Sequence, residues 1–150
     1  MDTKDIEAEA ATLMLDSFTE ATALRLGKIL VDLALADALP VVINIRTADR
    51  TLFHAALPGS APLNDLWARR KSNTALAFQL PSLLVGQRNK AKAEGLDRHG
   101  LPPGDYADSG GAVPVRVKGV GMVAVATVSG LPQVEDHKLV VRGLKALIAG

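Results

Sequence analysis

The clearest alternation of apolar and polar residues lies in the last third of the chain. The valines at positions 113, 115 and 117 alternate with a proline and two basic residues, which predicts a strand with one face toward solvent. The run from Met122 to Val128 is apolar at both parities, as in a strand covered on both faces. Residues 118–121 form a glycine-containing turn between the two runs. We therefore predict a hairpin whose second strand lies in the centre of a sheet.

A second pair of β-rich runs lies at residues 41–46 and 51–57, separated by a short polar stretch. This spacing predicts another antiparallel hairpin, with His54 in the middle of its second strand. Strands and helices do not alternate along the chain as they do in a doubly wound parallel sheet. The pattern favours an antiparallel sheet with helices on its faces, with a fifth strand between Tyr106 and Gly110.

Helical periodicity marks the segments that surround these hairpins. A capping box from Ser17 to Glu20 predicts the start of a core-covering helix that ends near Ala38. Two further helices are predicted over residues 62–78 and 81–94, where prolines lie near each start and a glycine follows the second. The glycine- and proline-rich stretch that follows, residues 97–111, is predicted to be an ordered surface loop, although its length also suits a lid or an interface segment.

The last helix, which follows Pro132, separates into a charged side and an apolar side. The charged side comprises Glu135, Lys138, Arg142 and Lys145. The apolar side comprises His137, Val140, Val141, Leu144 and Ile148. Because core-facing positions recur at this spacing, His137 is predicted to be buried.

The composition fits one domain over residues 1–150, with residues 1–16 as an N-terminal helical extension. Hydrophobic residues make up 48% of the chain, which is enough for a sizeable core. A net charge of +1 predicts no nucleic-acid partner, and the absence of cysteine excludes disulfides and thiolate metal sites. No apolar run approaches the length of a membrane span, and the acidic N-terminus does not resemble a secretory signal. We therefore expect a cytoplasmic protein without a membrane partner.

The predicted helix over residues 62–78 carries the most distinctive polar cluster, formed by Trp67, Arg70, Lys71 and Asn73. A guanidinium beside an indole suits a ligand that joins an anionic group to an apolar body. The same arrangement also suits an ion-pair and cation–π contact between subunits. Both interpretations stay open from the residues alone.

His54 and His137 are candidate metal ligands or bases. His137 lies in the first turn of its helix, where the helix dipole disfavours the protonated ring, and Asp136 is adjacent. The alternative is that each histidine is a structural residue that forms a hydrogen bond within the core. No nucleophile elbow, phosphate-binding loop, zinc-protease motif or dinucleotide fingerprint is present.

Three segments resemble one known family: LFHAALPGS at residues 52–60, NDLWARRKSN at 64–73, and SGGAVPVRVKGVGMVAVATVSGLPQVEDH at 109–137. They are similar to the haem-degrading domain superfamily of HbpS- and GlcG-like proteins, in particular to a subfamily of small bacterial and fungal members without an assigned function. The resemblance implies an α/β fold of profilin-like type, in which three α/β/α layers enclose an antiparallel sheet of about five strands. It also implies homo-oligomers.

Three functions follow as hypotheses. The first is binding of haem or a similar small anionic ligand, held by Arg70 and Lys71, with His54 or His137 as an axial ligand of the iron. The second is a non-catalytic oligomeric scaffold or adaptor, in which the helix of Trp67 is the contact surface. The third and weakest is a metal-assisted hydrolase that uses His54, Asp136 and His137. Haem is thus the expected cofactor, and further copies of the chain are the expected partners.

Overall fold

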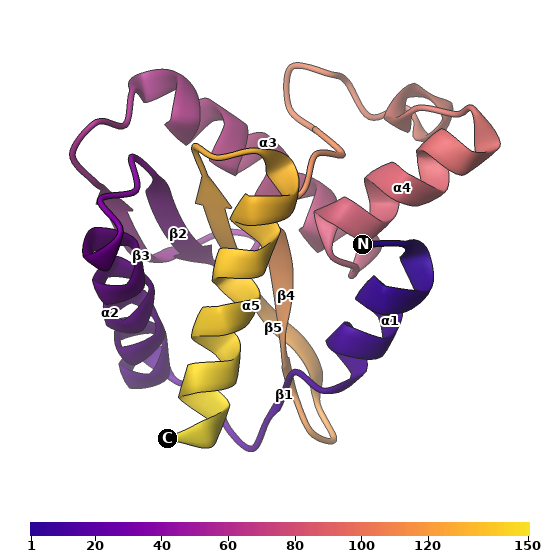
Figure 1. The fold of residues 1–150 in the computed structure, drawn as a ribbon. Helices are drawn as coiled ribbons and strands as arrows, with labels where there is room; N and C mark the ends of the chain where they lie inside the picture. Colours follow the sequence, from indigo (N-terminus) through magenta and orange to yellow (C-terminus); the bar gives the residue numbers. More distant parts are fainter.

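A five-stranded sheet lies between two layers of helices in the computed structural model, which describes all 150 residues (Figure 1). The strands are β1 (Met14–Leu15), β2 (Val42–Arg46), β3 (Thr51–Ala56), β4 (Ala112–Val117) and β5 (Gly121–Ser129). The helices are α1 (Thr3–Ala11), α2 (Glu20–Ala36), α3 (Pro62–Phe78), α4 (Ser82–Lys92), the short 3₁₀ helix η1 (Leu96–His99) and α5 (Gln133–Ala149). The layered α/β fold predicted from the sequence is confirmed.

The strands are arranged in the order β1-β4-β5-β2-β3, so β5 is central, as its apolar run predicts. Both predicted hairpins are present and antiparallel. The prediction of a purely antiparallel sheet is wrong at one edge, because β1 pairs in parallel with β4 through Met14 and Leu15. Residues 106–110 form no strand, so the predicted position of the fifth strand was also wrong. A two-residue strand has no period to detect, and it exists only through its tertiary partner.

The helices α2 and α5 cover one face of the sheet with aliphatic side chains. Alternate residues of the strands, such as Ile43 and Ile45 of β2, point into this layer and are fully buried. The two helices approach closely because Gly143 of α5 lies against Leu30 of α2, where an added Cβ would lie 2.4 Å from the leucine side chain. This layer supplies most of the apolar burial that stabilises the fold.

The opposite layer, under α3, is unusually polar. The buried face of α3 carries Ala68, Lys71, Ser72, Thr74 and Ala75. The matching apolar cluster contains only one residue of α3 and two of the sheet. Hydrogen bonds therefore replace much of the apolar packing between α3 and the strands. The candidate site lies in this layer.

Local details of the helices differ from the predictions at their ends. The first long helix begins at Glu20, because the side chain of Thr22 accepts a hydrogen bond from the Thr19 amide at 3.1 Å and completes a box different from the predicted one. It ends at Ala36, since Ala38 adopts a positive φ of 52°. Ile148 is 42% exposed, so the buried stripe of α5 stops before its last turn.

The first 16 residues form α1 and β1 and take part in the core. Ile6 of α1 is 1% exposed and packs against Leu83 and Leu84 of α4. None of the helices combines the length and the apolar character that a membrane-crossing segment needs. The cytoplasmic localisation expected from the N-terminal residues stays a prediction.

Candidate functional site

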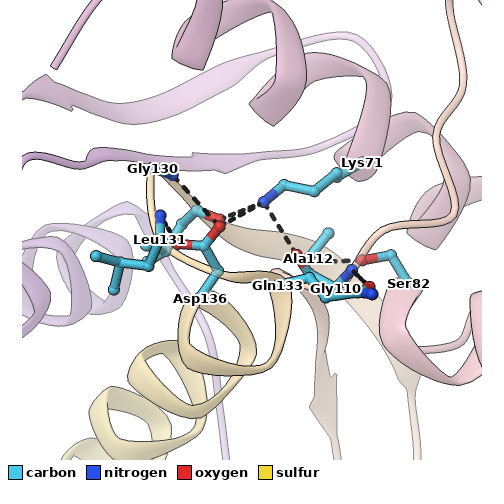
Figure 2. Close-up of polar contacts among 9 residues, drawn as sticks. Lys71, Ser82, Gly110, Ala112, Gly130, Leu131, Gln133 and Asp136 are labelled. Atoms are coloured by element: carbon cyan, nitrogen blue, oxygen red, sulfur yellow. Dashed lines mark hydrogen bonds and ion pairs between the residues drawn. The ribbon is translucent and has the colours of Figure 1, made fainter.

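A buried ion pair joins α3 to the start of α5 (Figure 2). The ammonium of Lys71 donates to the Asp136 carboxylate at 3.1 Å, to the Val128 carbonyl at 2.7 Å and to the Gly110 carbonyl at 3.0 Å. Both charged side chains are 3% exposed. An ammonium has three N–H groups, and here each has an acceptor. Lys71 therefore holds the fold together at this point and has no donor left for a ligand.

Asp136 completes the network from the other side. Its Oδ1 accepts from the Leu131 amide at 2.9 Å and its Oδ2 from the Gly130 amide at 3.3 Å, so the carboxylate fixes the turn between β5 and α5. Burial raises the pKa of Asp136 and lowers the pKa of Lys71, while the attraction between the two charges opposes both shifts.

The ion pair lies in the wall of a pocket of about 290 Å³, which we call the polar pocket. Its other polar side chains are those of Asn64, Ser109, Ser129 and Gln133. The Asn64 Oδ1 accepts from the Ala61 amide, and the Gln133 Oε1 accepts from the Gly110 amide, each at 2.8 Å. A backbone N–H can donate only to the oxygen of a side-chain amide, which fixes the orientation of both amides. Their NH₂ groups are therefore the atoms that remain free to donate to a ligand.

An adjoining pocket of about 430 Å³, which we call the tryptophan pocket, has a more apolar lining. Trp67 and Arg70 lie on one side, and Leu96, Leu101 and Tyr106 come from the long loop and η1. The Arg70 guanidinium carbon lies 4.3 Å from the centroid of the Trp67 ring. Its Nε donates to the Pro103 carbonyl at 2.9 Å, which holds the stacked arrangement. Trp67 and Ser109 line both pockets, which makes the two pockets neighbours.

Asn73 does not lie with the other residues of the predicted cluster. Its Oδ1 accepts from Arg46 at 2.7 Å and its Nδ2 donates to the Asp105 carbonyl at 2.8 Å. Arg46 is itself 7% exposed and also donates to Ser72 at 2.9 Å. Burial lowers the pKa of Arg46, and Arg69 adds to this shift. Asn73 therefore anchors the long loop to the sheet and lines neither pocket.

His54 lies on the α3 side of β3, with both ring nitrogens engaged. Its Nδ1 lies 3.0 Å from the Asn44 Nδ2, and its Nε2 lies 2.7 Å from the Asp65 Oδ1. Since the Asn44 amide donates to Nδ1, the proton of the neutral ring is assigned to Nε2, which donates to Asp65. His54 thus ties β3 to α3, and binding of an iron would require one of these bonds to break.

His137 is buried, as predicted, with 1% exposure. Its Nε2 lies 2.7 Å from the Glu9 carboxylate of α1, while its Nδ1 is buried without a partner. Neither His137 nor His54 lines the polar pocket or the tryptophan pocket. The geometry gives no support to either histidine as an axial ligand.

The trio of the hydrolase hypothesis is likewise not assembled. Asp136 faces Lys71, whereas His54 and His137 bind Asp65 and Glu9. The chain contains no group of three or more histidine, cysteine or carboxylate side chains that could hold a metal ion.

A family model described as Haem degrading protein HbpS-like matches residues 18–145. The chain belongs to the HbpS-like family. This agrees with the resemblance found in the sequence. Within the family, the chain is 47% identical over 145 residues to a UPF0303 protein of Streptomyces coelicolor, covering 96% of this chain and 92% of that protein.

Solved structures extend the comparison. The crystal structure of Ybr137w is similar with a TM-score of 0.91 and 29% identity, over 100% of this HbpS-like chain and 90% of that one. The PduOC:Heme complex is similar with a TM-score of 0.74 and 20% identity, over 88% of this chain and 95% of that one. At that identity the second likeness concerns the fold alone.

Several residues of the two pockets were missed by the sequence reasoning. Asn64, Ser129 and Gln133 were not singled out as ligand-binding residues, nor was Tyr106. A signal was present for Ser129 and Gln133, because they flank the glycine turn between a buried strand and a helix, where side chains and amides converge. Nothing in the local sequence indicated that Tyr106 lines the same pocket as Trp67.

Proposed function

We propose that this HbpS-like protein binds a planar ligand that carries a carboxylate, and that haem is the member of this class toward which the family points. The stacking of Arg70 on Trp67 at 4.3 Å carries the proposal. Only the Nε of Arg70 is used within the chain, so its remaining N–H groups can hold a carboxylate. The indole and the leucines of the tryptophan pocket suit an apolar ring system.

The residues of the tryptophan pocket fit haem in three respects. Arg70 suits a propionate, Trp67 with Leu96 and Leu101 suits the macrocycle, and the phenol of Tyr106 is a type of oxygen ligand that haem iron accepts. When bound, haem supplies an iron whose reactivity depends on its axial ligand and the polarity of its pocket. Tyr106 replaces His54 and His137 as our candidate axial ligand. The description of the family model as haem degrading supports the choice of ligand, and the PduOC:Heme complex shows that a chain of the same fold binds haem.

Titration with haemin tests this proposal through two signals. Trp67 is the only tryptophan of the chain, so quenching of its fluorescence reports binding beside the indole. The dependence on Arg70 assigns this binding to the tryptophan pocket, since Arg70 lines only that one of the two pockets. The Soret band reports ligation of the iron. We expect saturable quenching, and we expect Arg70→Ala to weaken haemin binding by about tenfold, the loss typical of a hydrogen bond to a charged group. Arg142→Ala, an exposed position on α5, is the matched control and should bind as the parent does.

Iron-free protoporphyrin separates the roles of Arg70 and Tyr106. It should bind with the same dependence on Arg70, whereas Tyr106→Phe should alter the Soret band of bound haemin. Haemin binding that is unaffected by Arg70→Ala would exclude the proposed anchor, and an unchanged Soret band in Tyr106→Phe would exclude the axial role.

We further propose that copies of the chain associate through the outer face of α3, which keeps the scaffold hypothesis open. Leu63 and Leu66 are 61% and 60% exposed, and they lie beside Trp67 on a helix whose opposite face is polar. Adjacent exposed leucines on one helix suit a contact between subunits.

Replacement of Leu63 and Leu66 together by lysine should dissociate such an oligomer, because it places charge in an apolar contact. Analytical ultracentrifugation measures the mass before and after the change. Leu24→Lys on α2 is the control, since Leu24 is 57% exposed on another helix. Equal masses for the parent and the double variant would rule out α3 as the contact.

A further inference from the structure

The polar pocket offers hydrogen-bond donors without unpaired charge. Asn64 and Gln133 line it, and their NH₂ groups have no acceptor within the chain, whereas their oxygens accept from backbone amides. The hydroxyl of Ser109 also lines it. The charges of Lys71 and Asp136 in its wall offset each other. A group that only accepts hydrogen bonds, and that carries a modest negative charge, matches this lining.

Ser129 gives independent support for a ligand at this place. It is 3% exposed, it lines the polar pocket, and no side-chain hydrogen bond within the chain involves its hydroxyl. The neighbouring Val128 carbonyl accepts from Lys71 and Asp136 binds the following amides, so the surrounding polar groups are already paired. The Ser129 hydroxyl is therefore free to form a hydrogen bond with an acceptor atom in the pocket.

The start of α5 adds a favourable field. The helix begins at Gln133 without a side-chain cap, and the amides of Glu135 and Asp136 already donate to the Pro132 carbonyl, so the amides of Gln133 and Val134 are the ones without an acceptor. The positive end of the helix dipole lies at the pocket, and because the Asp136 carboxylate in the wall is paired with Lys71, the dipole still favours a negative group there. Since the pocket has no unpaired cation to neutralise a second charge, a monoanion fits better than a phosphate dianion.

We propose that the polar pocket is a binding site for a carboxylate group, whose oxygens accept from Asn64, Gln133 and Ser129. Trp67 lines the same pocket, so a small aromatic carboxylate can place its ring against the indole. The site does not use Arg70 or Tyr106, and it stands whether or not haem binds in the tryptophan pocket.

Exchange of each amide for the matching acid gives a sharp test. Asn64→Asp and Gln133→Glu keep the oxygen that binds the backbone amide of Ala61 or Gly110, and they replace the NH₂ donor by a second, negatively charged oxygen. The fold should therefore be retained while carboxylate binding is lost. Lys145→Gln, an exposed position on α5, changes the net charge by the same amount and serves as the control.

The ligands for this test are benzoate, benzyl alcohol and phenyl phosphate. Binding of each is measured in NMR spectra of the full-length protein, through the side-chain NH₂ signals of Asn64 and Gln133. Benzoate should shift both signals saturably and bind at least about tenfold more tightly than either analogue, as expected for charge-assisted hydrogen bonds. Ser129→Ala should weaken benzoate binding by about tenfold, and Asn64→Asp and Gln133→Glu should each abolish benzoate binding. Absence of a saturable shift, binding that survives both acid exchanges, or equal binding of phenyl phosphate would each overturn the proposal.

Discussion

Replacement of Lys71 by methionine should lower the free energy of unfolding by about 3–5 kcal/mol at pH 7, the range typical of a broken buried ion pair. The substitution leaves the Asp136 carboxylate, which is 3% exposed, without its counter-charge. It also removes the donor from the Gly110 and Val128 carbonyls. Methionine has a similar length, so the loss reports the missing charge and hydrogen bonds more than a cavity. Urea denaturation of both proteins measures the difference.

The large loss of stability expected for Lys71→Met follows from the number of chain segments that the ion pair of Lys71 and Asp136 connects. Lys71 is on α3 and Asp136 is on α5 (Figure 2). The two carbonyls belong to the segment before β4 and to β5. One ammonium thus joins four parts of the chain. A Cβ at Gly111 would lie 2.4 Å from the Lys71 Nζ, so the backbone is also packed tightly around it.

The double variant Lys71→Met with Asp136→Asn tests whether the loss of stability comes from the unpaired buried charge. Removing both charges should cost less than the sum of the two single changes, because no buried charge is left unpaired and the amide oxygen still accepts from Leu131. Lys118→Met breaks an ion pair of comparable length at the surface, where the lysine is 65% exposed, and should change stability by no more than about 0.5 kcal/mol. Equal losses for Lys71→Met and Lys118→Met would refute the assigned role of the buried pair.

The parts of the fold that were predictable from the sequence are those encoded in short-range periodicity. The two hairpins, the central position of β5 and the burial of His137 each follow from spacings of two or of three to four residues. The parallel strand β1 was not predictable, since its two residues acquire their structure only by pairing with Arg116 and Val117.

The site was predictable only where its residues are close in sequence. Trp67 and Arg70 are three positions apart on a helix, so their contact follows from helical geometry. Lys71 is adjacent in sequence but points into the layer beneath α3, and its burial depends on partners 39, 57 and 65 positions away. The sequence therefore suggested a ligand-binding cation where the structure has a structural one.

A decrease in pH below 6.5 should destabilise the protein through His137. Burial lowers the pKa of His137 below its ordinary value of 6.5, and Lys138 adds to the shift, although the Glu9 carboxylate acts in the opposite direction. The unfolded chain binds a proton near pH 6.5 while the folded protein does not, so acid favours unfolding. The contribution of His137 is fully present above pH 6.5 and is lost as the pH falls through the folded pKa.

His137→Gln separates this titration from the packing of the side chain, because glutamine does not titrate and can still donate to Glu9. We expect a loss of about 1–3 kcal/mol at pH 8, as for many buried substitutions, but no further loss assignable to this position as the pH falls. Glu9→Gln should instead increase the loss of stability at low pH. It removes the carboxylate that raises the pKa of His137, so the decline in stability should extend to lower pH. Urea denaturation between pH 8 and pH 5 measures these slopes, and an identical slope in the parent and in His137→Gln would show that the buried imidazole does not control the acid sensitivity of the fold.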